Sequence, residues 1–91
     1  MNFKNEADII SLVYPNPGNG NVNLKLKGNL HDKISIQLLN TLGMEIYLKQ
    51  INVQQANEFT APLNLGSLTK GSYILRIVIR NKVYLHQLLI Q

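Results

Sequence analysis

Side chains that could act in catalysis or hold a metal are few in this sequence and follow no known catalytic spacing. The histidines are His31, in a segment typical of a loop, and His86, in the last apolar run. The patterns H-E-x-x-H, C-x-x-C and D-x-D-x-D-G are absent, so the sequence indicates neither catalytic zinc nor a calcium loop. We expect His31 to be solvated beside Asp32 in a turn. The His86 ring is expected to pack beside Ile77, with one nitrogen hydrogen-bonded or hydrated.

Carboxylates and serines do not build a better catalytic site. The carboxylates lie near the N-terminus, in a loop or at strand starts, where nothing would desolvate them and raise their pKa: Glu6, Asp8, Asp32, Glu45 and Glu58. No serine stands in the context of a nucleophile elbow. Gly18-Asn19-Gly20 is not followed by a helical pattern, so it is not a phosphate loop. We therefore predict that the protein is not an enzyme and needs no metal or cofactor.

Length and composition limit the remaining classes. A chain of 91 residues suits one domain with a modest core. Nine basic and five acidic residues give a formal charge of +4, spread along the chain. Because no basic stripe with interleaved aromatic residues occurs, we expect no nucleic-acid partner. The sequence has no cysteine, which excludes disulfides and thiolate metal sites. No apolar run reaches the roughly 18–20 residues of a membrane-spanning helix.

The N-terminal residues 1–8 are polar and aperiodic, which is typical of a linker end or of a start added for expression. The domain itself is expected over residues 9–91. The first eight residues lack the apolar core of a signal peptide, and taken literally this predicts a cytoplasmic protein. The alternative is that the sequence is a fragment of a larger protein.

Alternation of apolar and polar residues predicts about seven short strands with turn signals every eight to twelve residues or so. The expected strands are 9–14, 22–27, 33–38, 44–51, 59–65, 73–79 and 83–90. Residues 28–32 and 53–57 are expected to be loops, and Pro62 to lie in an edge or irregular strand. This spacing favours an all-β, antiparallel sandwich of the immunoglobulin-like or Greek-key type. The expected core comprises Leu24, Leu26, Ile34, Ile36, Leu38, Ile46, Leu75 and Ile77.

The last twenty-two residues or so, 70–91, predict two strands joined by a tight turn at Asn81-Lys82. That loop would pair Tyr73 with Ile90, Leu75 with Leu88, Ile77 with His86, and Ile79 with Tyr84. The final strand is then apolar on both faces, because Val83, Leu85 and Leu89 occupy the other one. A terminal strand of this kind is either covered by the protein or left for a partner.

Four features in this order carry a family resemblance. They are Tyr14-Pro15-Asn16-Pro17, Leu42-Gly43-Met44-Glu45, Leu68-Thr69-Lys70-Gly71-Ser72-Tyr73, and a terminal strand that closes the chain at Gln91. Together they resemble the C-terminal sorting domain of the type IX secretion system, the Por secretion tail of Bacteroidetes cargo proteins. The resemblance covers 9–91 and favours a fragment of a larger protein. One departure stands out: family tails often end in a strand that bears lysine or arginine, whereas residues 85–91 carry no full positive charge.

The motif residues also have structural interpretations. We expect Pro15 and Pro17 to stiffen the loop after the first strand. Gly43 is expected to supply a positive φ in a tight turn. Gly71 precedes Tyr73, whose ring would fill the core while its hydroxyl reaches the rim. The motif set is Tyr14, Pro15, Asn16, Pro17, Gly43, Gly71 and Tyr73.

The resemblance implies a non-catalytic sorting signal. A cargo domain would precede it, and the exported protein would pass through the periplasm to the outer membrane, cell surface or medium. The implied partners are the outer-membrane translocon, its β-barrel shuttle and a sortase-like cysteine protease that removes the tail. The expected recognition element is the last strand, namely Lys82, Val83, Tyr84, Leu85, His86, Gln87, Leu88, Leu89, Ile90 and Gln91. An isolated domain should form weak homodimers through this strand.

Two other functions stay open. One is a carbohydrate-binding or adhesive β-sandwich module of a cell-surface protein. Such modules need exposed aromatic residues, and this sequence has no tryptophan and four tyrosines. The other is a purely structural appendage. Glycan binding would identify the first, and failure to export a fused reporter would favour the second.

Overall fold

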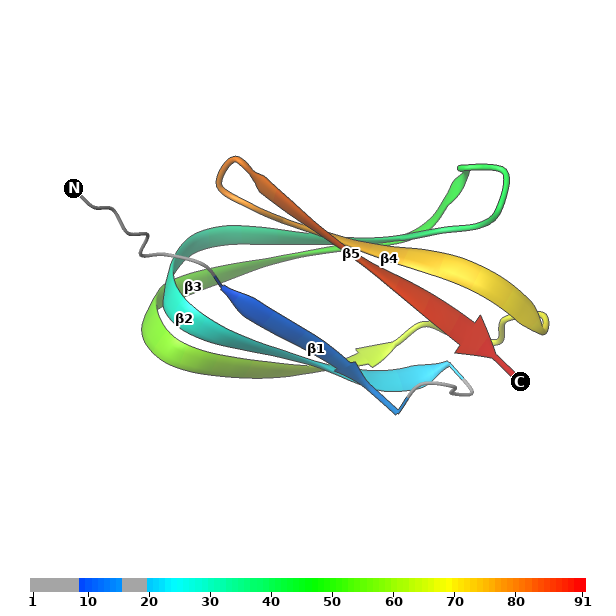
Figure 1. Cartoon of the computed structure of the whole chain (residues 1–91), viewed down its shortest axis with the longest axis horizontal. Helices are drawn as coiled ribbons and strands as arrows, with labels where there is room; N and C mark the ends of the chain where they lie inside the picture. The colour runs from blue at the N-terminus through cyan, green and yellow to red at the C-terminus, as the bar shows by residue number, and fades with distance from the viewer. Residues whose placement is uncertain (1–8, 16–19) are drawn as a thin grey trace.

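A computed structural model describes residues 9–15 and 20–91 of the chain. Its elements are five β-strands: β1 (Ile10–Tyr14), β2 (Asn21–Leu39), β3 (Glu45–Asn64), β4 (Gly71–Ile79) and β5 (Lys82–Ile90). Every pairing between them is antiparallel (Figure 1). The expected all-β, antiparallel class is therefore confirmed. The predicted linker at residues 1–8, Asn16 and Pro17 lie outside the described residues.

The long strand β2 organises the sheet. β3 pairs with β2 from Asn21↔Asn64 to Leu39↔Glu45 and so occupies one edge of it. On the other edge, β1 pairs with residues 23–27 of β2, and β4 pairs with residues 34–39. β5 extends the sheet beyond β4. The strand order is β1-β2-β4-β5, with β3 on the opposite side of β2.

The sheet folds over where β2 and β3 bend. The β2–β3 register shifts between Lys27 and Leu30 and again between Leu30 and Asp32. Asp32 has a φ of 119°. Bulges of this kind bend a strand and increase its twist without ending it. The two long strands consequently curl from one layer into the other, as the left end of Figure 1 shows. The result is a half-barrel with the core between its two layers.

This bend explains why the predicted strand number was wrong. Residues 28–32 and 53–57, expected to be loops, belong to β2 and β3. Their Gly, Asn, Asp and Gln residues interrupt the apolar alternation, but the backbone stays in the sheet. Two pairs of expected strands thus merge into two long ones. The structure is one curled sheet of five strands rather than a seven-stranded immunoglobulin-like sandwich.

The core contains most of the residues expected there. Leu24, Leu26, Ile34, Ile36, Leu38, Leu75 and Ile77 are each at most 1% exposed. Ile46 is the exception, because 42% of it is exposed. Its neighbour Tyr47 pairs with the buried Leu38, so Tyr47 faces inward and Ile46 faces outward. The predicted core position of Ile46 is therefore wrong.

The β4–β5 hairpin also differs from its predicted register. Ile79 pairs with Lys82, so the two-residue loop is Arg80-Asn81, and Arg80 has a φ of 55°. Arg80 Nη1 lies 3.0 Å from His31 Nε2, and Arg80 Nη2 donates to Asn29 O at 3.4 Å. These contacts attach the turn to the bend of β2. His31 is exposed as expected, but it lies in a strand and contacts Arg80.

The corrected register pairs Tyr73 with Leu88, Leu75 with His86, and Ile77 with Tyr84. Each partner is displaced by two positions from the predicted one. A shift of two residues leaves every side chain on its original face. The predicted inner and outer faces of the final strand are therefore confirmed even though its pairs are wrong. Pro62, in turn, lies in β3, which among the described strands pairs with β2 alone, as expected for an edge strand.

Candidate functional site

The expected recognition strand is covered on one face and open on the other. β5 is the last strand in the order and pairs with β4 along its whole length. On the inner face, Leu88 and Ile90 are 0% and 3% exposed. On the outer face, Leu85 is 63% exposed, Val83 is 49% exposed and Leu89 is 41% exposed. The inner face of β5 therefore contributes to the core, while its outer side chains are accessible to a partner.

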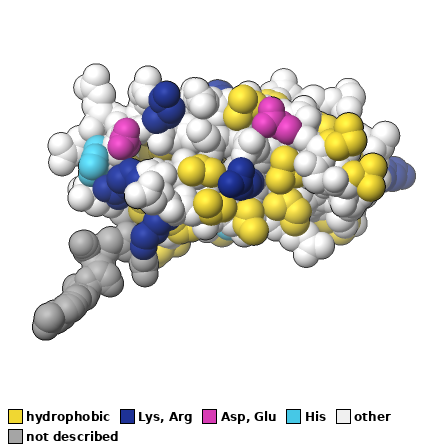
Figure 2. Space-filling view, turned by 90° about the horizontal axis from the view of Figure 1, so that it is seen from above, with side chains coloured by type: hydrophobic (Ala, Val, Ile, Leu, Met, Phe, Trp, Pro, Cys, Tyr) yellow, Lys and Arg dark blue, Asp and Glu magenta, His cyan; other side chains and the backbone are white. Residues whose placement is uncertain are grey.

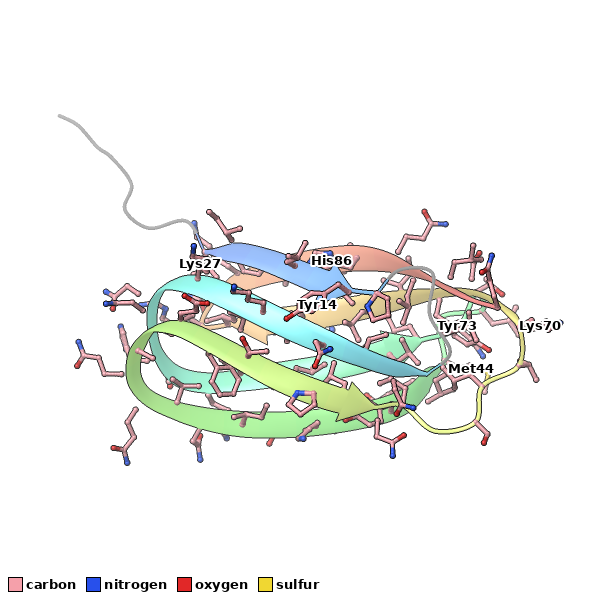
Figure 3. The ribbon with its side chains drawn as sticks, turned by 90° about the horizontal axis from the view of Figure 1, so that it is seen from below. Tyr14, Lys27, Met44, Lys70, Tyr73 and His86 are labelled. Carbon is pink, nitrogen blue, oxygen red and sulfur yellow. The ribbon has the colours of Figure 1, made fainter. Side chains whose placement is uncertain are left out.

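The two ends of the strand order are joined by a side-chain hydrogen bond. Ser11 Oγ on β1 lies 2.7 Å from His86 Nε2 on β5. Figure 3 shows His86 where β5 passes beside β1. Burial lowers the pKa of His86, because the charged imidazolium would lose water there. The expected hydrogen bond of this histidine is confirmed, but its cross-strand neighbour is Leu75 rather than Ile77.

The outer face of β4 and β5 forms an apolar patch around an arginine. We call this set the outer patch, and it comprises Ile74, Val78, Val83, Leu85 and Leu89 together with Arg76. Arg76 stands opposite Leu85, and Val78 stands opposite Val83. Figure 2 looks onto this side of the molecule and shows hydrophobic side chains gathered around a basic one.

A short chain of hydrogen bonds leads away from the outer patch. Arg76 Nη1 donates to Gln37 Oε1 at 2.7 Å, and Gln37 Nε2 donates to Glu45 Oε1 at 2.7 Å. The sequence analysis did not single out Arg76 as a functional residue. The sequence did contain a signal for Arg76. It shares its predicted strand face with Ile74 and Val78, and two apolar residues beside an arginine are unusual on a face open to water.

The motif around Tyr14 lies where β1 ends. Tyr14 is 39% exposed and pairs with Asn23, and the Tyr14–Pro15 peptide bond is cis. The predicted stiffening of the loop by Pro15 stays a prediction, since Asn16 and Pro17 are not among the described residues.

Gly43 lies in the turn between β2 and β3 with a φ of 81°, which confirms the expected positive φ. A Cβ atom added there would meet nothing within 4 Å, so only the backbone conformation favours glycine. Asn40 holds the same turn, because its Oδ1 accepts from Leu42 N at 2.9 Å and from Met44 N at 3.0 Å. The sequence analysis missed Asn40, although asparagine before a tight turn is a known signal.

Gly71 opens β4 and pairs with Ile90. Tyr73, two positions later, is 7% exposed, so its ring lies in the core as predicted. Its hydroxyl donates to Thr69 O at 2.6 Å and lies 3.0 Å from Thr69 Oγ1. Figure 3 shows Tyr73 at the end of the molecule where the loop of Lys70 enters β4. The hydroxyl thus closes the loop that leads into the terminal hairpin.

Other potential sites are modest. A pocket of about 130 Å³ lies between the turn after β2 and the start of β4, lined by Asn40, Thr41, Ser72, Tyr73, Ile74 and Gln87. Over residues 9–15 and 20–91, no three His, Cys, Asp or Glu side chains gather as metal ligands would. No helix in the same residues is long and apolar enough to span a membrane.

These features define a small antiparallel β domain whose last hairpin has an apolar outer face, while further exposed apolar side chains lie on β1 and β3. The model of the secretion system C-terminal sorting domain family matches residues 12–91, nearly the whole chain. The chain therefore belongs to this family of type IX secretion sorting domains, which is not a known class of enzymes. Among curated proteins, none matches the sequence.

Proposed function

We propose that this domain directs an attached cargo protein across the outer membrane and that the secretion machinery binds its terminal strand, residues 82–91. Family membership supports the role in type IX secretion. The observation that carries the choice of strand is the position of β5 at the end of the sheet order, with Val83, Leu85 and Leu89 exposed on its outer face. Such a strand can offer both backbone groups and alternating apolar side chains.

The proposal assigns partners by family membership. The outer-membrane translocon and its β-barrel shuttle bind the folded domain, and a sortase-like cysteine protease removes it at the cell surface. The cargo precedes the domain and passes through the periplasm. Free of these partners, two copies of the domain associate weakly by pairing the edges of their β5 strands or by exchanging these strands.

A carbohydrate-binding module is a poorer match to the tyrosine positions. Tyr73 is buried, and Tyr47 and Tyr84 are partly buried on the inner face. Tyr14 alone among the four is exposed. A sugar platform needs several aromatic rings on one accessible face, and these tyrosines do not share one.

The experiment fuses residues 1–91 behind a signal peptide and a fluorescent reporter in a Bacteroidetes host with a working type IX system. Export to the medium or cell surface is compared with that of a fusion lacking residues 82–91. This deletion also removes the buried Leu88 and Ile90, so it can unfold the domain. Leu89→Lys is therefore tested beside it, because Leu89 is 41% exposed on the outer face.

We expect the wild-type fusion to be exported and both altered fusions to be retained. A thermal melt of purified Leu89→Lys shows whether the domain is folded. If folded Leu89→Lys and the deletion are both exported like the wild type, the terminal strand is not the signal. If the wild-type fusion stays in the periplasm, the sorting function itself is wrong.

A further inference from the structure

The outer patch is unusual for a surface open to water. Leu85 is 63% exposed and stands opposite Arg76 of β4, and Val83 is 49% exposed and stands opposite Val78. Soluble proteins rarely expose large contiguous apolar patches, and a patch of this kind with a polar rim commonly marks a binding site. The inner face of the same hairpin already supplies the core, so folding of this domain does not require the outer patch to be apolar.

Arg76 indicates which ligand chemistry would suit the outer patch. Its guanidinium carries five N–H donors, and the described structure uses one of them, for Gln37 Oε1 at 2.7 Å. Arg76 makes no direct ion pair of the kind that joins Lys25 to Glu58 in the described structure, and the Glu45 carboxylate is linked to it only through Gln37. Arg76 is partly buried between Ile74 and Val78. A planar guanidinium in such surroundings suits a carboxylate ligand.

The small pocket adjoins the patch through Ile74. Its volume of about 130 Å³ lies near that of a roughly 150 Å³ cavity that binds benzene. The turn at Asn40 and Thr41 forms one wall, and Gln87 of β5 forms another. A single aliphatic or phenyl side chain would fill this space.

We propose that the outer patch binds a protein of the export machinery that presents an apolar surface bearing one carboxylate, which pairs with Arg76, and one apolar side chain, which enters the pocket. This inference rests on the proposed function and specifies the partner's chemistry. A second copy of the chain is a poorer occupant, because each copy carries a formal charge of +4. A symmetric contact centred on Arg76 would also bring two guanidinium groups together.

The test uses the same reporter fusion with Arg76→Glu and Leu85→Glu. Leu12→Glu is the matched control, since Leu12 is an exposed leucine on β1, at 53%, in the other layer of the sheet. We expect each patch variant to reduce the exported reporter about tenfold or more, because it opposes the partner's carboxylate or its apolar surface. Leu12→Glu should be exported within about twofold of the wild type. Melts of the purified domains establish that each variant folds.

A photo-crosslinking amino acid placed at position 85 or at position 12 gives a second measurement. We expect the label at 85 to form an adduct with an outer-membrane component of the secretion system, identified by mass spectrometry, and the label at 12 to form none. If Arg76→Glu fails to fold, Arg76→Gln replaces it, since it removes the charge and keeps a donor for Gln37.

Each contrary result has its own meaning. Export of folded Arg76→Glu and Leu85→Glu at the wild-type level would overturn the inference and leave the sorting function intact. Retention of the wild type would overturn the sorting function and this inference with it. A concentration-dependent dimer of the purified domain that Leu85→Glu disperses would show that a second copy occupies the outer patch, which also overturns the inference.

Discussion

Ser11 and His86 are 75 positions apart in the sequence, yet Ser11 Oγ lies 2.7 Å from His86 Nε2. They belong to β1 and β5, the two ends of the strand order. The hydrogen bond therefore links β1 to β5, two strands that no backbone pairing joins. His86, the one partly buried histidine of the described structure, thus lies at the contact between β1 and β5.

Stability should fall in mild acid because of His86. Burial lowers its pKa in the folded state, whereas an unfolded chain has a histidine pKa of about 6.5. Above that pH the histidine is neutral in both the folded and the unfolded state, and its full contribution to the free energy of unfolding is present. As the pH falls through about 6.5 toward the lower folded pKa, the unfolded chain binds the proton first and the contribution is lost.

Urea unfolding at pH 8, 6 and 5 would measure this effect. The free energy of unfolding should decrease less over this range for His86→Gln than for the wild type. Equal slopes for His86→Gln and the wild type would show that His86 does not cause the pH dependence.

Gly43 should tolerate asparagine better than valine. Its φ of 81° lies in a region that β-branched residues avoid and asparagine tolerates. Because an added Cβ meets no atom within 4 Å, a clash does not complicate the comparison. We expect Gly43→Val to cost more than about 1 kcal/mol of unfolding free energy and Gly43→Asn to cost less. Equal losses in denaturant melts would mean that backbone conformation is not the reason for the glycine.

Two of the inward tyrosines, Tyr73 and Tyr84, should respond differently to loss of the hydroxyl. Tyr73 Oη donates to Thr69 O at 2.6 Å, so Tyr73→Phe should lower the unfolding free energy by about 1 kcal/mol. Tyr84 Oη is buried and has no hydrogen-bond partner among the described residues. Tyr84→Phe should therefore be neutral or stabilising, because it removes an unsatisfied polar group. A clear loss of stability in Tyr84→Phe would reveal a partner for that hydroxyl.

Ile36 and Ile46 provide a test of which face of the sheet is buried. Ile36 is 0% exposed and Ile46 is 42% exposed. Truncation of Ile36 to alanine should cost about 2–5 kcal/mol, since it leaves a cavity. The same truncation at Ile46 should change the unfolding free energy by no more than about 0.5 kcal/mol. Comparable losses at the two positions would contradict the inward orientation of Tyr47.

The sequence by itself determined the class of fold and most of the core. Period-two alternation is a local property, so it identified the buried faces of β2 and β4 through Leu24, Ile36 and Leu75. The same local logic anticipated the positive φ of Gly43 and the buried ring of Tyr73. The motif order also led to the family. Each of these features depends on a few neighbouring residues.

Tertiary structure alone decided where the strands bend, in which register they pair and which side chains of different strands become neighbours. Residues 28–32 look like a loop, but packing of the two layers keeps them in β2 through bulges. A slip of two residues in the β4–β5 register preserves both faces, so alternation cannot distinguish the pairs. The outer patch around Arg76 and the Ser11–His86 bond join strands that are distant or separately patterned in the sequence. The β4–β5 register assembles the outer patch, and only the curvature of the complete sheet brings Ser11 and His86 together.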